Sequence, residues 1–148
     1  MKEKLQEAVD LFEEVMIYGT EQVIKNMDVQ IWKEYSPEQI QVLKILSTYG
    51  PQSNGKLAEM QGVHKSAISN RLKKLVDKGL ITSERDVIDQ RAKVSKLTDI
   101  GREVLQISND AVYENVESLF RGQITEEELD VFVETFRKLK TILQMKEI

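Results

Sequence analysis

Apolar residues at spacings of three and four predict helices over most of the chain. The first such pattern covers residues 3–33, with Gly19 as a weak point inside it. Residues 36–39 (SPEQ) then have the form of a capping box, with serine as the N-cap and proline at the first helical position. This motif predicts a second helix that ends before Gly50, because the following proline disfavours helical geometry in the residue that precedes it.

The middle of the chain predicts two short helices followed by a β-hairpin. Ser53 can cap the first of these helices, which Gly62 closes, and the second carries an apolar stripe. Two short helices joined by a glycine turn form the helix-turn-helix pattern. Residues 80–85 and 93–97 then contain β-branched residues with partial alternation, which predicts two strands. The stretch 86–92 between them, interpreted as polar, predicts a charged hairpin tip, that is, a wing.

Two longer helices are predicted for the C-terminal third of the chain. Thr98 can cap the first, which ends at Gly122, and residues 125–128 (TEEE) form a second capping box that opens the last helix. Both carry apolar residues along one face. The whole pattern predicts a mainly α fold with a small β-hairpin wing.

A length of 148 residues fits one compact domain. We expect a single domain over residues 1–148, with a winged helix-turn-helix part at 36–101 and helical parts at 1–33 and 102–148.

The formal net charge of −4 is unevenly distributed along the chain. Residues 64–102 hold ten Lys or Arg against five acidic residues, a net charge of +5, whereas the remainder of the chain carries −9. A basic block between acidic ends is expected when one surface meets a polyanion and the rest keeps the protein soluble. The charge pattern therefore favours double-stranded DNA as a partner.

Several classes of function are disfavoured by residue usage. The chain has no cysteine and a single histidine, which excludes disulfides, thiol nucleophiles and a multi-histidine metal site. It also lacks a glycine-rich phosphate loop, so we expect no enzyme, no metal and no cofactor. No stretch approaches the ~18 apolar residues of a spanning helix, and the charged N-terminus does not resemble a signal peptide. We therefore expect a cytoplasmic protein with no membrane partner.

Six short motifs follow one another along the chain. They are SPEQ at 36–39 with VL at 42–43, LAE at 57–59, VHKSAIS at 63–69, LVDKGLI at 75–81, DQR at 89–91 and LTDIG at 97–101. In this order and spacing they resemble the MarR family of bacterial regulators. The resemblance implies a two-fold dimer in which residues 1–33 and 102–148 form the dimerisation part. The function we expect is a DNA-binding transcriptional regulator, a ligand-responsive repressor acting as a homodimer on a pseudo-palindromic operator.

Polar residues of the second short helix are candidates for contact with bases. They lie opposite its apolar stripe, so burial of the stripe directs them outward. Lysine can bind guanine, asparagine can pair with adenine, and serine permits close approach. The alternative is an ordinary solvated helix face, but the adjoining wing and the charge distribution favour DNA. Many relatives have arginine where this chain has Asn70, so base preference does not carry over. The candidates are His64, Lys65, Ser66, Ser69, Asn70 and Lys73.

The hairpin contributes a second set of candidates. Asp89, two residues before Arg91, can accept hydrogen bonds from its guanidinium and hold it toward a narrow minor groove. The alternative is a surface ion pair worth ~0 to 1 kcal/mol. The wing candidates are Arg85, Asp89, Arg91 and Lys93. The expected phosphate contacts are Ser53, Arg71 and Lys96, with an intramolecular ion pair as the alternative for Arg71.

Four aromatic residues suggest a site for a small aromatic or anionic effector. They are Tyr18, Trp32, Tyr35 and Tyr49, near the junction of the first two predicted helices. Core and interface packing is the favoured alternative for these residues. The alternative function for the whole chain is a protein-interaction adaptor that keeps the fold without specific DNA binding. A salt-dependent shift of random duplex DNA distinguishes the adaptor from the regulator.

Overall fold

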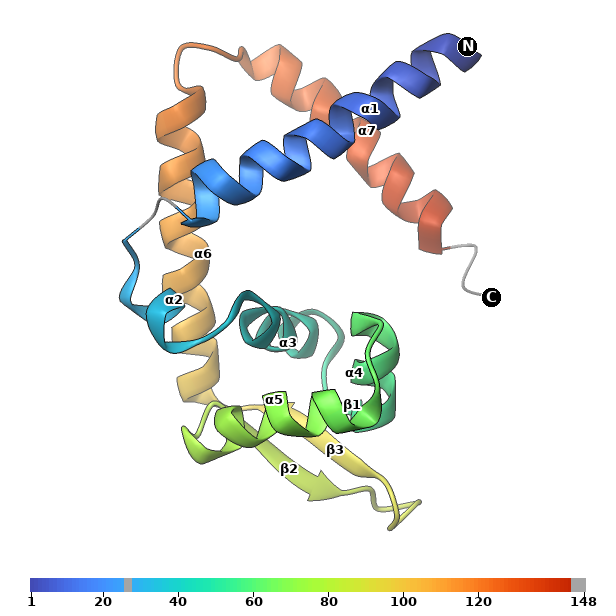
Figure 1. Cartoon of the computed structure of the whole chain (residues 1–148), viewed down its shortest axis with the longest axis vertical. Helices are drawn as coiled ribbons and strands as arrows, with labels where there is room; N and C mark the ends of the chain where they lie inside the picture. Colours follow the sequence, from blue (N-terminus) through green and yellow to red (C-terminus); the bar gives the residue numbers. More distant parts are fainter. Residues whose placement is uncertain (26–27, 145–148) are drawn as a thin grey trace. The chain divides into compact units, whose positions relative to one another are not determined.

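The computed structural model of the chain describes residues 1–25 and 28–144. It contains two compact units, Met1–Tyr113 and Glu114–Ile148. The described elements are mainly helical, and a small antiparallel sheet lies in the first unit (Figure 1). The predicted fold class is thus confirmed, whereas the single domain over residues 1–148 stays a prediction. No described helix is long and apolar enough to cross a membrane.

The N-terminal segment is not the single helix predicted for residues 3–33. Helix α1 covers Lys2–Gly19, a π-helical segment η1 follows at Thr20–Lys25, and α2 covers Gln30–Glu34. The regular α-helix therefore ends at Gly19, which was the weak point of the pattern. Glycine costs about 1 kcal/mol relative to alanine inside a helix, so an apolar period alone does not carry α-helix through it.

Helix α3 (Pro37–Tyr49) begins as its capping box predicts. The amide of Gln39 donates to Ser36 Oγ at 3.1 Å, and the amide of Ser36 donates to Gln39 Oε1 at 2.9 Å. Gly50 follows with φ 79°, a backbone conformation that residues other than glycine rarely adopt. Both predicted ends of this helix are therefore confirmed.

Helices α4 (Asn54–Gln61) and α5 (Lys65–Asp77) form the predicted helix-turn-helix. Ser53 Oγ accepts a hydrogen bond from the amide of Lys56 at 3.1 Å and so caps α4. Gly62, with φ 66° and ψ 36°, is the left-handed residue that ends α4 and allows α5 to start three residues later.

The wing has one strand more than the sequence predicted. Strands β2 (Ile81–Arg85) and β3 (Lys93–Leu97) form the expected antiparallel hairpin, with Arg85 opposite Lys93. The two-residue strand β1 (Gln52–Ser53) pairs with the other edge of β3, giving the order β1-β3-β2. A strand this short shows no alternation in the sequence. Its consequence is that the N-terminus of α4 is attached directly to the wing.

Helix α6 (Asp99–Phe120) is tied closely to the end of the sheet. Thr98 Oγ1 accepts from the amide of Gly101 at 3.0 Å and donates to the carbonyl of Gly79 at 2.6 Å. A Cβ on Gly101 would lie only 2.1 Å from the carbonyl oxygen of Leu80. The close approach of the first turn of α6 to the chain before β2 therefore requires glycine here.

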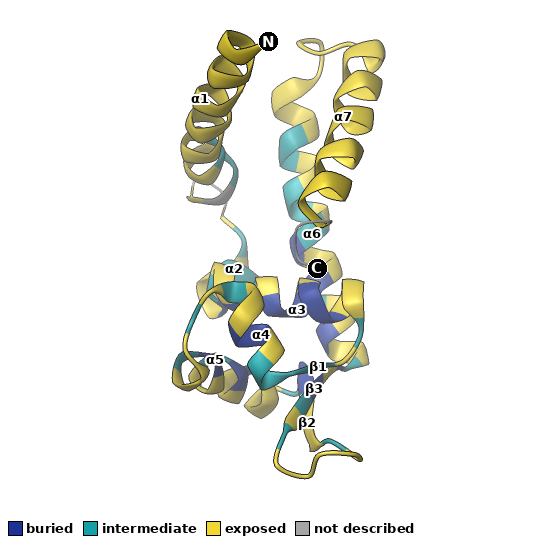
Figure 2. Cartoon of the chain, turned by 90° about the vertical axis from the view of Figure 1, so that its right-hand side faces the viewer, coloured by how far each residue is buried: buried dark blue, intermediate teal, exposed yellow. Residues whose placement is uncertain are grey.

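Helix α7 (Glu126–Gln144) begins at the second predicted capping box. The amide of Glu128 donates to Thr125 Oγ1 at 3.2 Å, and the amide of Thr125 donates to Glu128 Oε2 at 2.9 Å. Both α1 and α7 lack buried residues, as Figure 2 shows. Their amphipathic patterns thus form helices whose apolar faces stay exposed in the single chain.

The core of the first unit gathers where α3, α4, α5, the sheet and the start of α6 meet (Figure 2). This core holds one face of α5 against α3, α4 and β2 and leaves the opposite face of α5 in solvent. The largest fully buried apolar side chains are Val42, Leu43, Leu57, Ile68, Leu75, Leu80 and Ile81.

Candidate nucleic-acid interface

One hollow brings together residues from both predicted DNA-contacting sets. It has a volume of about 670 Å³ and lies between the start of α4, the exposed face of α5 and the wing. We call it the basic groove. Six of the candidate DNA-contacting residues line it, although they lie up to forty positions apart in the sequence. They are Ser53, Lys65, Ser69, Lys73, Arg91 and Lys93.

The face that α5 presents to the basic groove follows from its buried stripe. Because Ile68 and Leu75 are buried in the core, the side chain of Lys73 is exposed beside the groove. Ser69 Oγ donates to the carbonyl of Lys65 at 2.9 Å, which leaves the lone pairs of the hydroxyl oxygen for an external donor. The helix thus offers one hydroxyl and two ammonium groups to the same hollow.

On the wing, Asp89 holds the backbone of Arg91 and not its guanidinium. Asp89 Oδ1 accepts a hydrogen bond from the amide of Arg91 at 3.0 Å. Among the described residues, the carboxylate of Asp89 forms no ion pair with the guanidinium of Arg91, so that part of the wing hypothesis is wrong. This hydrogen bond is that of an Asx turn, in which an aspartate side chain accepts from the backbone amide two residues later. The amide of Arg91 lies closer to the Asp89 carboxylate along the chain than the end of the arginine side chain does.

The cations of the basic groove form no ion pair with another described residue, in contrast to those on the other side of α5. On the other side, Lys78 pairs with Glu34 at 3.3 Å and Lys74 donates to the carbonyl of Glu34. Asp77 is the acidic residue that lines the groove. A polyanion therefore meets available positive charge in the groove. The four groove cations are Lys65, Lys73, Arg91 and Lys93.

The other candidates lie outside the basic groove. Asn70 and Arg71 line a separate hollow of about 530 Å³ shared with Trp32 and Tyr35. Arg71 Nη1 donates to Gln61 Oε1 at 2.7 Å, so its guanidinium is engaged within the molecule. His64 is the N-cap residue of α5. The remaining candidates are exposed and do not line the groove: Ser66, Arg85, Asp89 and Lys96.

The four aromatic residues do not form a common pocket, and that prediction is wrong as a set. Tyr18 and Tyr49 are exposed at 60% and 53%, whereas Tyr35 is buried in the core, where packing was the alternative. Trp32 is half-buried, and its Nε1 donates to Ser108 Oγ at 2.9 Å. Sequence spacing alone could not separate these four environments, because each depends on tertiary packing.

Trp32 also lines a second hollow, together with residues that the sequence analysis did not single out. The hollow has a volume of about 540 Å³ and lies between α2, α3 and α6. We call it the α2–α3–α6 pocket. Lys33 also pairs with Asp28 at 2.6 Å, and this contact lowers the pKa of the Asp28 carboxyl. The pocket is lined by Lys25, Val29, Trp32, Lys33, Pro37, Ile40, Gln41, Lys44, Ser108, Asn109, Val112 and Tyr113.

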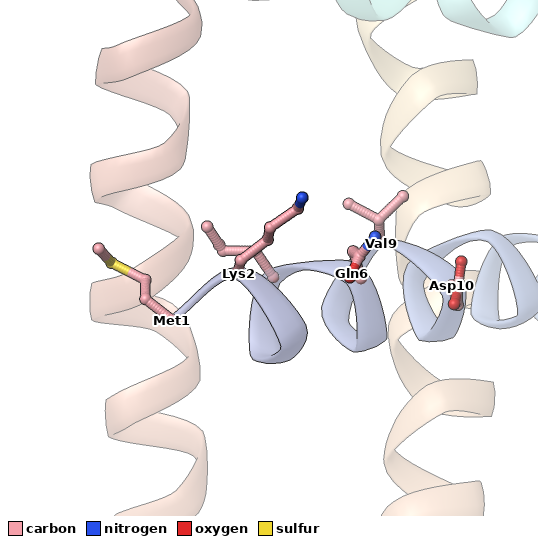
Figure 3. Close-up of a pocket in the computed structure, with 6 residues that line it drawn as sticks. Met1, Lys2, Gln6, Val9 and Asp10 are labelled. Carbon is pink, nitrogen blue, oxygen red and sulfur yellow. The ribbon is translucent and has the colours of Figure 1, made fainter.

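A further hollow lies along the first turns of α1 (Figure 3). All of its lining residues belong to the segment Met1–Asp10 of one helix. None is a candidate site residue, and the hollow follows the exposed face of the helix.

Comparison with known proteins agrees with this geometry. The model of the MarR family matches residues 35–93, which include every residue assigned above to the basic groove. The chain is 41% identical over 142 residues to the uncharacterized HTH-type transcriptional regulator YdgG of Bacillus subtilis, covering 95% of this chain and 93% of that protein. The chain belongs to the MarR family. It is a DNA-binding transcriptional regulator with a winged helix-turn-helix.

Solved structures share the fold along nearly the whole chain. A MarR family protein from Bacillus stearothermophilus superposes with a TM-score of 0.78 at 17% identity, covering 97% of this chain and 98% of that one. The transcriptional regulator BldR from Sulfolobus solfataricus gives a TM-score of 0.70 at 25% identity, covering 93% and 97%. The MarR fold thus extends beyond the residues that the family model matches.

Proposed function

We propose that this MarR-family chain is a homodimeric repressor that binds a pseudo-palindromic operator through the basic groove. The observation that carries the proposal is the convergence of α5 and wing residues on one hollow. In this docking mode α5, the second helix of the helix-turn-helix, enters the major groove, and the wing reaches the neighbouring minor groove or backbone. A dimer bound in this way covers promoter DNA, so repression by occlusion is its simplest regulatory effect.

The dimer is supported by the apolar faces of the terminal helices. Neither α1 nor α7 contains a buried residue, so each exposes a row of large apolar side chains. Exposed apolar surfaces of this extent mark interaction sites, and a second copy of the chain is the partner expected of a two-fold regulator. On α1 they include Leu5, Val9, Phe12 and Met16; on α7 they include Leu129, Phe132, Phe136 and Leu143.

The oligomeric state and the operator test this proposal together. Sedimentation is expected to give a dimer at micromolar concentration, and footprinting on a selected duplex is expected to show two half-sites. Their separation is expected to be roughly one helical turn, about 34 to 36 Å. A stable monomer or a single asymmetric half-site would contradict the dimeric operator complex. In transcription assays on a template carrying the site, added protein is expected to lower transcript yield.

The adaptor alternative is tested with random duplex DNA. The basic groove predicts binding to any sequence that weakens steeply with added salt, since cations that neutralise phosphates release counterions. An adaptor requires no such binding. Absence of a shift at low salt would favour the adaptor over the regulator.

The α2–α3–α6 pocket supports a ligand response. Its volume of about 540 Å³ falls in the range of small-molecule sites, and Trp32 and Ile40 supply apolar walls. Lys33 and Lys44 place ammonium groups at the same hollow, which favours an aromatic effector with a carboxylate. The pocket also contains the hydrogen bond from Trp32 to Ser108, which links α2 to α6.

Fluorescence of Trp32, the chain's only tryptophan, measures such binding directly. Benzoate is expected to change the emission saturably and to weaken DNA binding over the same concentration range. Lys44→Gln is expected to weaken both effects by removing one ammonium group from the pocket. Lys56→Gln, outside the pocket, is the matched control. An unchanged emission with benzoate, or equal responses of the two variants, would contradict this site.

A further inference from the structure

Two branched apolar side chains stand fully exposed at the tip of the wing. Val87 is 91% exposed and Ile88 is 95% exposed, and among the described residues only Met1 has a more exposed large apolar side chain. They lie in the loop between β2 and β3, which projects away from the helices of its unit (Figure 1). Exposing two such side chains forgoes burial energy, which favours a partner at this point.

The loop holds the two side chains in a closed turn. Asp86 Oδ1 accepts from the amide of Ile88 at 2.8 Å, and the amide of Asp86 donates to the carbonyl of Ala92 at 2.9 Å. The amide of Ala92 donates in turn to the carbonyl of Asp89 at 3.0 Å. The apolar tip is therefore presented by hydrogen-bonded backbone and not by a frayed end.

Cations flank the tip and identify the chemistry of its partner. Arg85 and Lys93 face each other at the last pair of the β2–β3 ladder, and Arg91 and Lys93 line the basic groove. Asp86 and Asp89 also adjoin the tip, so residues 85–93 carry a net charge of +1. A surface that carries negative charge around an apolar interior complements such a tip. The DNA minor groove meets this description, with phosphates on its walls and stacked bases between them.

We propose that Val87 and Ile88 form an apolar wedge that enters the minor groove and opens a base step, an inference that rests on the proposed DNA-binding function. Apolar side chains inserted in this way unstack adjacent bases and kink the duplex. Pyrimidine–purine steps such as TA unstack most easily, whereas A-tracts are stiff and have a narrow groove that attracts arginine. The wing then reads two different properties: Arg91 reads groove width and the wedge reads deformability.

The test compares two duplexes of equal length and equal charge that consist of A·T pairs only. One has alternating TA steps and the other is an A-tract. Wild-type protein is expected to bind both, with added affinity for the alternating duplex from the wedge. The double variant Val87→Ser, Ile88→Ser is expected to lose about fivefold to thirtyfold in affinity on the alternating duplex and less on the A-tract. Its salt slope is expected to stay unchanged, because no phosphate contact is removed.

Two matched variants separate the wedge from the cations and from the fold of the loop. The double variant Val87→Ile, Ile88→Leu keeps apolar side chains and is expected to retain wild-type affinity and selectivity. Arg91→Ala is expected to lower the salt slope and to lose most affinity on the A-tract. Fluorescence energy transfer between the ends of the alternating duplex is expected to report a bend with wild-type protein and a smaller bend with the serine variant.

The outcomes distinguish failure of the wedge from failure of the proposed function. If wild-type protein binds neither duplex, the DNA-binding proposal fails first. If it binds both and the serine variant keeps the same affinity ratio and bend, the wedge is overturned while DNA binding stands. A serine variant that instead alters the sedimentation of DNA-free protein would assign the tip to contact between copies of the chain and overturn the wedge as well.

Discussion

Replacing Gly101 by alanine has two opposing effects on the free energy of unfolding. The gain in helix propensity raises it, whereas the close packing seen in the structure lowers it. Alanine favours helix over glycine by up to about 1 kcal/mol. A Cβ at this position, however, would lie 2.1 Å from the carbonyl oxygen of Leu80 and 2.7 Å from Leu97 Cδ1. The nearest atom belongs to the backbone, so rotating a side chain does not relieve the overlap.

The cost can be worked from the groups that must move. Shifting the carbonyl of Leu80 disturbs the hydrogen bond that it accepts from the amide of Thr98 at 3.1 Å, worth about 0.5 to 1.5 kcal/mol. Overpacking of a filled site costs about 1 to 3 kcal/mol more. After the gain in helix propensity, Gly101→Ala is expected to lower the free energy of unfolding by about 1 to 3 kcal/mol. For a chain of this size the melting temperature would fall by roughly 3 to 10 °C.

Thermal unfolding followed by far-ultraviolet circular dichroism measures this loss. The variants are compared at equal protein concentration, since dimerisation makes the melting temperature concentration-dependent. Gly55→Ala in α4 is the matched control, because a Cβ there would make only ordinary contact with Lys65 Cε at 3.6 Å. Its melting temperature is expected to equal or exceed that of the wild type. A Gly101→Ala protein that melts at or above the wild-type temperature would refute the close packing of α6 on the chain before β2.

Two further predictions follow from hydrogen bonds seen in the structure. Ser36→Ala is expected to lower the free energy of unfolding by about 1 kcal/mol, because the amide of Gln39 loses its acceptor. Urea unfolding measures this loss, and an unchanged unfolding midpoint would contradict the role of Ser36 as a cap. Asp89→Asn is expected to tighten DNA binding, since the amide oxygen can still accept from the Arg91 amide while the negative charge is removed. Asp89→Ala is expected to bind more weakly than Asp89→Asn in the same titration; the reverse order would show that the turn does not matter.

Elements with short-range determinants could be predicted from the sequence. The capping boxes at residues 36–39 and 125–128 involve partners three positions apart, so their hydrogen bonds follow from the sequence alone. The helix-turn-helix was recognisable for a similar reason, since Gly62 marks the turn between two helices. These local signals placed α5 and the wing, and with them most residues of the basic groove.

Features that depend on distant partners could not be predicted. Strand β1 exists because Gln52 and Ser53 meet β3 some forty positions later, and two residues carry no period. Trp32 lines a pocket because Ser108 faces it from α6, which aromatic spacing does not indicate. The exposed pair at the wing tip, Val87 and Ile88, was hidden inside a stretch interpreted as polar.

The basic groove is proposed to bind DNA, and the salt dependence of duplex binding tests this proposal most directly. Two variants with the same net charge are compared with the wild type, each with four cations replaced by glutamine. If each groove cation contacts phosphate in a dimer, the groove variant is expected to lower the slope of log K against log salt by as much as about seven units. The control variant is expected to keep the wild-type slope. The groove variant changes Lys65, Lys73, Arg91 and Lys93, and the control changes Lys2, Lys4, Arg137 and Lys140. Equal slopes for the two variants would contradict the assignment of DNA binding to the groove.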